Sequence, residues 1–464
     1  MLHVSDKPTA VALLAIVVLV AQSVFAQPLS TFEAADGLRD PVGSPVEVSD
    51  PPATPVDEAA SRVEIGEYLD AINLVELEID KIERRSNRYN IELARPLVVL
   101  GDALAGVGDR EGALGAYDRA VHVTRVNRGL HHPSQVEIVY REAVVLAANG
   151  QVRRANRRHE YAYDILLRNF GGDNPSLLPG IFSLADWYLG NYNIFSARSL
   201  YAHALSLADG ALADDDPKRL RALRGVAATY RSERFPPYQR ESKSSSSQYP
   251  TFRHGTMPMI NNFAKGERAL IEVVNTVKAS DDASVEDLAL AVLELADWYL
   301  VFEKHDRATT LYRHTWELLE SNPDLLAETF DAPTPLYLPL PGNPEDDGVP
   351  AGRPRNGVVE LSFRVDESGD VSGIATLHSE PRDLMDSKVK RAVRRARYRP
   401  AFDGKTTLAT DDVRVSHEFV YFPDDDFPVD DQIPAKEPAD TAQAPHSPAR
   451  AFGNDQIVPA AASR

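Results

Sequence analysis

The stretch "LGDALAGVGDREGALGAYDRA", residues 100–120, reads as one helix, a turn and the start of a second helix. Its small residue Gly101 allows a neighbouring helix to approach closely. Gly108 suits the end of the first helix, because glycine adopts the left-handed conformation without strain. Ala113 is a second small residue, and Tyr117 follows it about one helical turn later. This order of residues predicts a hairpin of two packed helices.

The same residue types recur every 42 residues over much of the chain. A fixed period of this length predicts a stack of similar helical hairpins. Prolines keep the same step, and proline is tolerated at the start of a helix because its missing N–H would have no partner there. The positions in step are Gly66, Gly108 and Gly150; Gly101, Ala143, Ala185 and Ala227; Ala71, Ala113, Ala155 and Ala197; Tyr117, His159 and Tyr201; and Pro133, Pro175 and Pro217.

The hexapeptide "LADWYL" occurs at residues 184–189 and again at 295–300, an offset of 111 residues. Two steps of 42 leave 27 residues over, which is the length of the Ser- and Pro-rich stretch Pro236–Asn262. We therefore predict about five hairpins, with a partial one at the N-terminal end and one repeat interrupted by this insertion. Eight small residues are predicted to pack at helix crossings: Gly101, Ala113, Ala143, Ala155, Ala185, Ala197, Ala296 and Ala308.

Four polar residues are candidates for a groove on the array. Asp186 and Asp297 are the polar members of the two hexapeptides, and His203 and His314 recur with the same offset. For the two histidines, a packing role is the alternative. The carboxylates of the chain are numerous, and their spacing does not indicate a catalytic pair.

The repeats resemble the tetratricopeptide repeat family. The consensus positions are matched by Leu100, Gly101, Gly108, Ala113, Tyr117 and Ala120. Units that open with "HHP", "DNP" and "DDP" (131–133, 173–175 and 215–217) are similar to the long-repeat variety of kinesin light chains. The resemblance covers roughly residues 59–319 and implies an all-α solenoid whose concave surface binds protein partners.

A different pattern begins near residue 357. "GVVELSFRVDESGDVSGIATLHS" (357–379) alternates apolar and polar residues, which predicts a half-buried strand, a turn and a second strand. A helix is expected next, with Leu384, Val389, Ala392, Val393 and Ala396 on one face, and then a third strand over residues 414–422. The expected fold class is therefore multidomain, with an all-α helical-hairpin solenoid followed by a small α+β module of ββαβ order.

This second module resembles the C-terminal domain of TonB-type energy transducers. Its most specific piece is "RYRPAFDG", with the signature residues Arg397, Tyr398, Arg399, Pro400, Ala401 and Gly404. The resemblance implies that a receptor peptide adds a strand to an exposed sheet edge. The candidate edge residues are Asp412, Arg414, Ser416, Glu418 and Val420. Alternatively, the strand only packs Val413, Val415, Phe419 and Tyr421 against the helix.

Residues 1–26 have the pattern of a secretory signal peptide, with an apolar run at Ala10–Ala21 and small residues before Gln27. The alternative is an uncleaved anchor helix, because Thr9–Ala26 has about the ~18-residue minimum for a membrane span. The chain contains no cysteine. A disulfide framework is therefore excluded, as is a lipid anchor on a cysteine at the cleavage point.

Composition sets the expected boundaries between the segments. Two Pro-rich stretches, residues 27–59 and 326–356, are predicted to be linkers. They flank the helical array at 60–325 and precede the C-terminal module at 357–423. Residues 424–464 are acidic and then rich in Pro and Ala, which predicts a disordered tail.

Several function classes are disfavoured by the sequence. The formal net charge of -19 argues against a nucleic-acid partner. There is no phosphate loop, G-x-S-x-G elbow or zinc-protease pair, and neither His131-His132 nor the acidic runs 214–216 and 424–426 have the further ligands of a metal site. We expect no cofactor and no small-molecule substrate.

The expected function is that of a non-enzymatic scaffold with protein partners, including outer-membrane receptor peptides. By its signal segment it would be exported to the periplasm of a Gram-negative bacterium. The alternative is a TonB-type energy transducer, anchored by a single span in the inner membrane.

Overall fold

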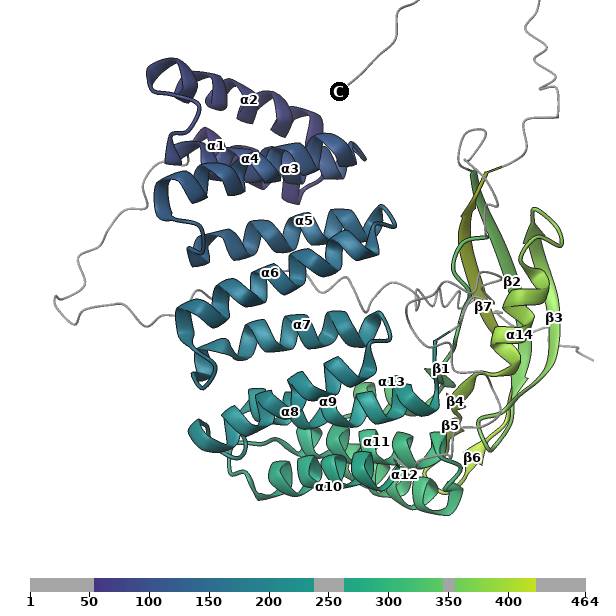
Figure 1. The fold of residues 1–464 in the computed structure, drawn as a ribbon. Helices are drawn as coiled ribbons and strands as arrows, with labels where there is room; N and C mark the ends of the chain where they lie inside the picture. Colours follow the sequence, from purple (N-terminus) through teal and green to yellow (C-terminus); the bar gives the residue numbers. More distant parts are fainter. Residues whose placement is uncertain (1–53, 238–262, 345–354, 423–464) are drawn as a thin grey trace, which may run out of the picture. The chain divides into compact units, whose positions relative to one another are not determined.

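The computed structural model describes residues 54–237, 263–344 and 355–422. Within this part of the chain, helices that pack in consecutive pairs are followed by short and long strands. Figure 1 shows the helices stacked in chain order. The array and residues 356–421 belong to one compact unit.

Six helical hairpins make up the array in the described residues, and the predicted all-α repeat is confirmed. Five are full hairpins; the first has a short opening helix of 10 residues. The paired helices are α1 (Pro55–Glu64) and α2 (Tyr68–Arg85), α3 (Ala94–Gly106) and α4 (Arg110–Arg128), α5 (Val136–Ala148) and α6 (Val152–Phe170), α7 (Leu178–Gly190) and α8 (Ile194–Ala211), α9 (Pro217–Arg234) and α10 (Phe263–Ala279), and α11 (Val285–Val301) and α12 (His305–Leu319). We call the two members of each pair helix A and helix B.

In five of the six hairpins, all but the fifth, the turn between the two helices depends on one residue in the left-handed conformation. The predicted turn glycines have this conformation, with φ of 84° at Gly66, 86° at Gly108 and 68° at Gly150. The same step of the repeat leads to Tyr192 (φ 59°), and the 111-residue offset then leads to Glu303 (φ 62°). The geometry of the turn is therefore kept even where a side chain makes it unfavourable.

Each repeat opens with a side-chain cap. His132, Asn174 and Asp216 stand before the three prolines in step, and each side chain accepts a hydrogen bond from the backbone N–H two residues later. Asn90 does the same one repeat earlier. Because it makes this cap, the His132 side chain has a structural role.

The small residues of the predicted set are buried. All seven alanines of the predicted set have no measurable exposure. At Gly101 a Cβ atom would lie 2.4 Å from Cε1 of Tyr117 on the paired helix. The close approach of helices A and B therefore requires a small residue at this crossing.

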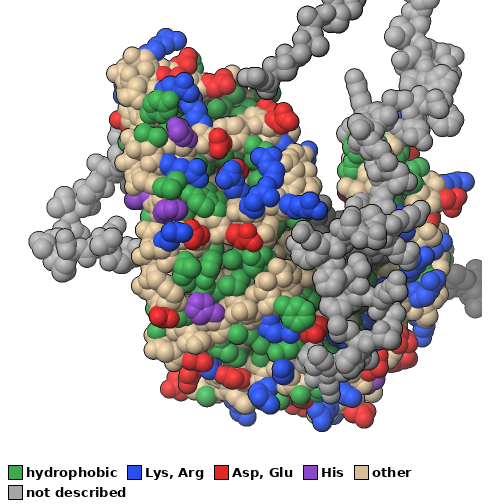
Figure 2. Space-filling view, viewed as in Figure 1, with side chains coloured by type: hydrophobic (Ala, Val, Ile, Leu, Met, Phe, Trp, Pro, Cys, Tyr) green, Lys and Arg blue, Asp and Glu red, His purple; other side chains and the backbone are tan. Residues whose placement is uncertain are grey.

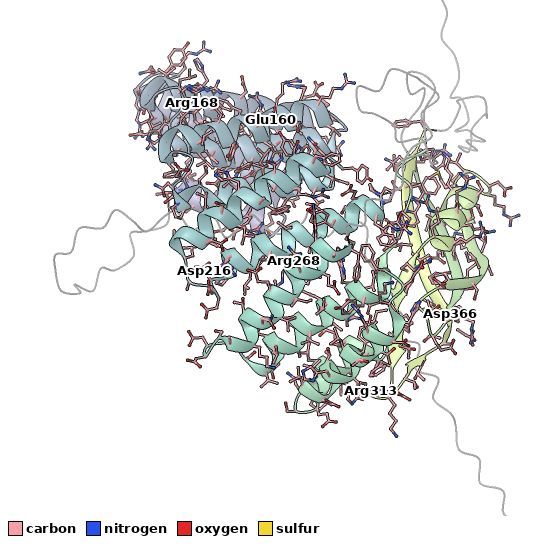
Figure 3. The ribbon with its side chains drawn as sticks, turned by 60° about the horizontal axis from the view of Figure 1, so that its bottom comes forward. Glu160, Arg168, Asp216, Arg268, Arg313 and Asp366 are labelled. Carbon is pink, nitrogen blue, oxygen red and sulfur yellow. The ribbon has the colours of Figure 1, made fainter. Side chains whose placement is uncertain are left out.

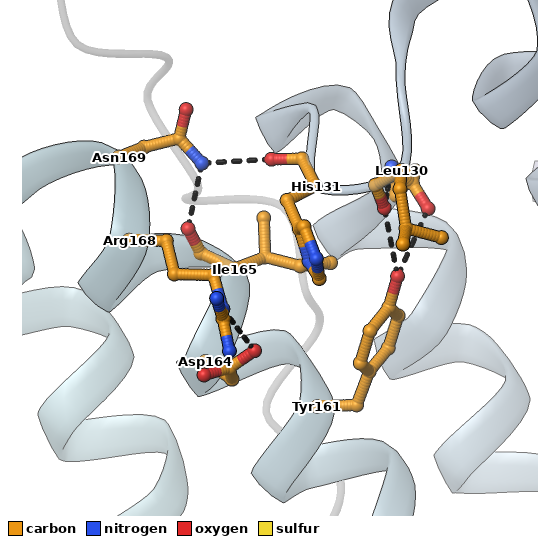
Figure 4. Close-up of polar contacts among 8 residues, drawn as sticks. Leu130, His131, Tyr161, Asp164, Ile165, Arg168 and Asn169 are labelled. Atoms are coloured by element: carbon orange, nitrogen blue, oxygen red, sulfur yellow. Dashed lines mark hydrogen bonds and ion pairs between the residues drawn. The ribbon is translucent and has the colours of Figure 1, made fainter.

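Hydrogen bonds from helix B to the preceding loop join one hairpin to the next (Figure 4). Tyr161 Oη donates to the carbonyl oxygen of Leu130 at 3.0 Å. Asn169 Nδ2 donates to the carbonyl oxygen of His131 at 2.7 Å, and also to that of Ile165 in its own helix. These bonds satisfy loop carbonyls that would otherwise lack partners.

The predicted insertion falls between the two helices of the fifth hairpin, since α9 ends at Arg234 and α10 begins at Phe263. Residues 238–262 themselves lie outside the described residues, as do the predicted signal segment and the predicted tail, 424–464. The structure has no helix among its described residues that is both long and apolar enough to cross a membrane.

The prediction of a linker up to residue 59 is wrong for its last residues. Helix α1 begins at Pro55, and the side chain of Thr54 accepts a hydrogen bond from the backbone N–H of Asp57. The Asp57 carboxylate in turn accepts from the Thr54 backbone N–H at 3.0 Å. Proline therefore marks the first turn of a capped helix here, and not an extended chain.

The second predicted linker, 326–356, is also wrong in its first part. It contains the end of helix α13 (Pro323–Phe330) and strand β1 (Thr334–Tyr337). The Phe330 side chain is completely buried against Tyr312, Trp316 and Phe402. One buried aromatic side chain fixes a segment whose proline content indicated an extended chain.

The C-terminal module has the predicted ββαβ order, with three additional short strands. Its main sheet has the strand order β3-β2-β7. On β2, Val359, Leu361, Phe363 and Val365 are buried as the alternation predicted. The elements are β2 (Arg355–Val365), β3 (Val371–Glu380), α14 (Asp386–Arg394), β4 (Arg397–Arg399), β5 (Ala401–Phe402), β6 (Thr407–Leu408) and β7 (Thr410–Tyr421).

Two expected members of the helical face lie outside α14: Leu384 before it, and Ala396, which is buried, after it. Leu384 lies before α14 and is 40% exposed, whereas Met385 takes the buried place. The helix begins later than its apolar pattern indicated, because the chain turns at residues 382–385 before Asp386.

Two glycine-to-alanine substitutions in the second hairpin should have opposite effects on stability. Gly101→Ala places a methyl group against the Tyr117 ring, and such overpacking typically costs about 1–3 kcal/mol. Gly115→Ala lies on the exposed side of α4 with nothing within 4 Å, and should stabilise the helix by about 0.5–1 kcal/mol. Urea unfolding of the two variants measures both effects. Equal signs would contradict the close crossing at Gly101.

Candidate peptide-binding sites

Three hairpins join their two helices by an aspartate–tyrosine hydrogen bond. The aspartate directly follows the small residue of helix A, and the tyrosine stands 15 residues later on helix B. Burial raises the pKa of each tyrosine, so the hydroxyl stays protonated and acts as the donor. The pairs are Asp102 with Tyr117 (2.6 Å), Asp186 with Tyr201, and Asp297 with Tyr312 (2.9 Å).

Hairpins without the aspartate also lack the tyrosine. The third hairpin has Val144 and His159 at these positions, and the fifth has Ala228 and Leu270. The His159 ring stacks on Trp187 of the next hairpin, with centroids 4.3 Å apart. The two positions therefore change together, because a buried hydroxyl needs the acceptor.

Each of the three aspartates also faces an arginine from a later element. Arg141 of α5 donates through Nη1 to Asp102 at 2.8 Å, and Arg221 of α9 donates through Nη2 to Asp186 at 2.6 Å. Both arginines come from helix A of the following hairpin. For the last hairpin the arginine is Arg399 of strand β4, whose Nη1 lies 3.9 Å from Oδ2 of Asp297. Strand β4 therefore stands where a further repeat would stand.

The two predicted groove aspartates differ in exposure. The Asp186 side chain is 48% exposed on the array, whereas that of Asp297 is 18% exposed beside β4. Burial raises the pKa of Asp297, and the opposing effects of Arg399 and Tyr312 only reduce this shift. Asp186 is thus a surface group already bound by Arg221, and Asp297 is part of a junction.

His203 makes a packing contact, which is the alternative role considered for it. Its Nε2 lies 3.1 Å from the carbonyl oxygen of Gly172 in the preceding loop, which is the bond that Tyr161 makes one repeat earlier. His314 is 51% exposed and lies 3.7 Å from Glu317 on the same helix. Among the described residues, neither histidine makes a hydrogen bond or ion pair with Asp186 or Asp297.

The signature residues lie between the sheet and the last hairpin. Arg397 pairs with Asp370 at 2.8 Å, and the Tyr398 ring packs on Phe363 with centroids 5.6 Å apart. Pro400 and Ala401 are buried. Gly404 has φ of 87°, and a Cβ there would lie 2.9 Å from Nε1 of Trp316 on α12. The signature therefore shapes the contact with the array.

Phe402 is the apolar centre of this contact. It is 3% exposed and packs within an aromatic cluster with Tyr312, Trp316 and Phe330. Close by, Arg313 of α12 (labelled in Figure 3) donates through Nη2 to the carbonyl oxygen of Lys405 at 3.1 Å. Strand β4 also pairs with β1, which follows α13. The C-terminal module is thus attached to the array by packing as well as by the chain.

Strand β7 is an edge strand of the main sheet, since it pairs only with β2 in the order β3-β2-β7. Val415 and Phe419 are buried toward α14, and Val413 and Tyr421 are partly buried. The predicted set Asp412, Arg414, Ser416, Glu418 and Val420 is exposed. One set of side chains on this strand therefore packs against the core, and the predicted set faces outward.

One hydrogen bond identifies the open side of β7, which is the side that faces away from β2. The backbone N–H of Val420 donates to the side-chain oxygen of Asn343 at 2.9 Å, and not to a strand. Backbone groups of a strand point alternately to its two sides. Glu418 and Ser416 therefore share the open side with Val420.

The array also has a basic surface that the sequence analysis did not single out. Figure 2 shows Lys and Arg side chains gathered over the middle hairpins. The first half of α6 contributes Arg153, Arg154, Arg157 and Arg158, of which Arg158 pairs with Glu142 at 2.6 Å. Among the described residues, no group of three or more His, Cys, Asp or Glu side chains is placed to hold a metal ion.

Truncation of Phe402 should separate the two modules. Phe402→Ala removes the apolar centre of the junction, and Phe-to-Ala changes in cores cost about 3–5 kcal/mol. We expect calorimetry to show two thermal transitions where the wild type shows one. Leu408→Ala is the matched control, because Leu408 lies on the adjacent strand β6 and is 41% exposed. A single transition for Phe402→Ala would contradict the docking.

Stability should depend on pH through His159. Burial lowers the pKa of His159 from the usual 6.5 to about 4, so the unfolded chain takes up the proton first as pH falls. Its contribution is complete above pH 6.5 and is lost between pH 6.5 and about 4, by up to about 3 kcal/mol. Urea unfolding at pH 7 and 4.5 measures the loss. His159→Phe should reduce it, and His314→Gln, at an exposed position, should leave it unchanged.

The C-terminal module matches a known family. Residues 351–419 match the family described as Gram-negative bacterial TonB protein C-terminal. No curated protein matches the chain.

Solved structures with TPR-like repeats show a distant likeness of fold. A Podosopora anserina protein of the kinesin light chain type, with nearly identical TPR-like repeats, is 17% identical with a TM-score of 0.38; the match covers 49% of this chain and 96% of that one. BtubC (BKLC) from P. vanneervenii is 13% identical with a TM-score of 0.39, over 64% of this chain and 100% of that one. The chain combines an array of helical hairpins with a C-terminal module that matches the TonB C-terminal family.

Proposed function

We propose that this chain is an exported, non-enzymatic scaffold of the Gram-negative envelope that binds a partner peptide as an added strand on β7. The observation that carries the proposal is the open side of β7. An edge strand offers unpaired N–H and C=O groups in a regular row, and an extended peptide satisfies them by pairing.

The geometry of β7 favours this use over simple packing. Strand β7 has 12 residues, which is long for an edge strand that is to be protected from pairing. Its buried residues already fix it on α14, so the exposed set is available without any loss of core. One N–H of the row, that of Val420, is bound by the Asn343 side chain. An incoming peptide would replace this single bond with a strand.

The array would supply a second surface for protein partners. Stacked hairpins expose helix A residues over a long distance, as solenoid scaffolds do. The exposed ion pair of Asp186 with Arg221 and the basic residues of α6 give this surface polar and charged groups. Export rests on the signal-peptide pattern of residues 1–26.

The match of residues 351–419 to the TonB C-terminal family favours one second candidate, an inner-membrane TonB-type energy transducer. The two candidates differ in the fate of residues 1–26. Mass spectrometry of the mature protein purified from the envelope decides between them. A chain that begins at Gln27 supports the exported scaffold, and an intact N-terminus in the membrane fraction supports the transducer.

A proline on the open side of β7 should abolish strand addition. Ser416→Pro removes the N–H that the peptide would use, and proline is tolerated where that N–H faces solvent. We expect at least tenfold weaker capture of outer-membrane proteins on the immobilised full chain, quantified by mass spectrometry. Ser416→Ala keeps the N–H and should behave as wild type.

Hydrogen exchange with a captured partner adds a direct reading. The amides of Ser416 and Glu418 should become protected when the partner is added. Capture that is equal for Ser416→Pro and Ser416→Ala, without protection of these amides, would rule out strand addition at β7.

A further inference from the structure

The junction between the array and β4 contains a cluster of charged residues from three elements. Helix α9 contributes Arg224 and Arg231, which are two helical turns apart and lie on one face. Helix α11 contributes Glu294 and Asp297 on one face, and β4 contributes Arg399. We call these five residues the junction cluster.

Only one ion pair in the junction cluster is complete. The Nε atom of Arg224 donates to both carboxylate oxygens of Glu294, at 2.9 and 2.8 Å. Asp297 is left to face two arginines. Its hydrogen bond comes from Tyr312, and Arg399 approaches no closer than 3.9 Å.

Arg399 is buried without the hydrogen bonds that a guanidinium requires. The residue is 8% exposed, and its Nε and Nη1 atoms are buried with no hydrogen-bond partner. A guanidinium has five N–H donors in a fixed fork that matches a carboxylate. The free-energy penalty for burying unpaired donors is larger for a charged group than for a neutral one. Binding of a partner to this fork would therefore be strongly favoured.

Arg231 is also poorly compensated. Its charged neighbours are Asp297 and Glu294, yet burial outweighs both and lowers the pKa of Arg231. The residue nevertheless remains exposed at the surface. The Arg231 side chain is therefore close to the two carboxylates of α11 and still open to solvent.

We propose that the junction cluster binds a carboxylate of an acidic peptide, with Arg231 and Arg399 as its ligands. The cluster holds three arginines and two carboxylates, so it is one negative charge short. A carboxylate fits the planar fork of Arg399 better than a spherical anion does. The site is separate from the edge of β7, and it stands whether or not β7 takes up a strand.

Binding of a labelled peptide to the full chain tests the proposal. The probe is a fluorescein-labelled decapeptide of alternating glutamate and glycine, and its glutamine counterpart is the control ligand. We expect fluorescence anisotropy to show binding of the glutamate peptide alone, weakened by added salt because the attraction is between charges.

Matched arginine variants locate the site. Arg231→Gln should weaken binding about tenfold or more, as expected for the loss of a charge-assisted hydrogen bond. Arg221→Gln on the same helix should leave it unchanged, because Arg221 is already paired with Asp186. Arg399→Lys keeps the charge but loses the fork, and should give an intermediate loss. Since Arg231 is exposed, its variant should fold even if a change at Arg399 disturbs the junction.

Asp424–Asp426 of the same chain also carry carboxylates that can compete with the peptide. Binding of the peptide is therefore also measured for a variant in which all three are changed to Asn. Tighter binding of the probe to this variant, still lost with Arg231→Gln, supports the site and makes the tail a competitor for it. Equal binding by the wild type and Arg231→Gln would overturn the proposal. So would no binding to either the wild type or the Asn variant.

Discussion

The array depends on the close crossing of the two helices in each hairpin. At Gly101 the Tyr117 ring lies where a Cβ would stand, and the hydroxyl of that ring is held by Asp102, the next residue along the chain. The small residue thus determines the position of the ring, and the ring determines the position of the carboxylate. Asp186 and Asp297 make the same bond to a tyrosine, with alanine as the small residue at the crossing. Packing inside each hairpin therefore places one acidic group on helix A, where an arginine of the following element reaches it.

The C-terminal module uses the same acidic group at the end of the array. A helical solenoid has an exposed last hairpin, and terminal repeats must be covered or made polar. Here the last hairpin is covered by β4 and β5, which supply Arg399 to Asp297 and Phe402 to the aromatic cluster. The ion pair is looser than those inside the array, at 3.9 Å against 2.6–2.8 Å. A segment of a different fold thus takes the place of a repeat without reproducing its geometry.

Repetition explains which features could be predicted from the sequence. The helix crossings and the turns at Gly108 and Gly150 recur at a fixed step, and the structure contains them. The turns at Tyr192 and Glu303 could not be predicted from residue type, because tyrosine and glutamate do not indicate a left-handed backbone. Only their positions in the repeat do. The 15-residue spacing of Asp186 and Tyr201 was available as a signal, since it recurs at Asp297 and Tyr312. The contact of Asp297 with Arg399 could not be predicted from the sequence, because it joins two modules of unlike fold.

The two candidate surfaces belong to one packed body. Strand β7 follows β6, which pairs with β5, and β5 carries Phe402 into the last hairpin. The path from the open edge to the array is therefore short and packed, with no proline-rich spacer in between. The other connection, from α13 to β1, is likewise fixed by Phe330 and by the pairing of β1 with β4. A flexible spacer lets a peptide-binding domain search for its receptor at a distance. This architecture instead holds the edge strand in a fixed relation to the helices, which suits a scaffold that presents two partners to each other.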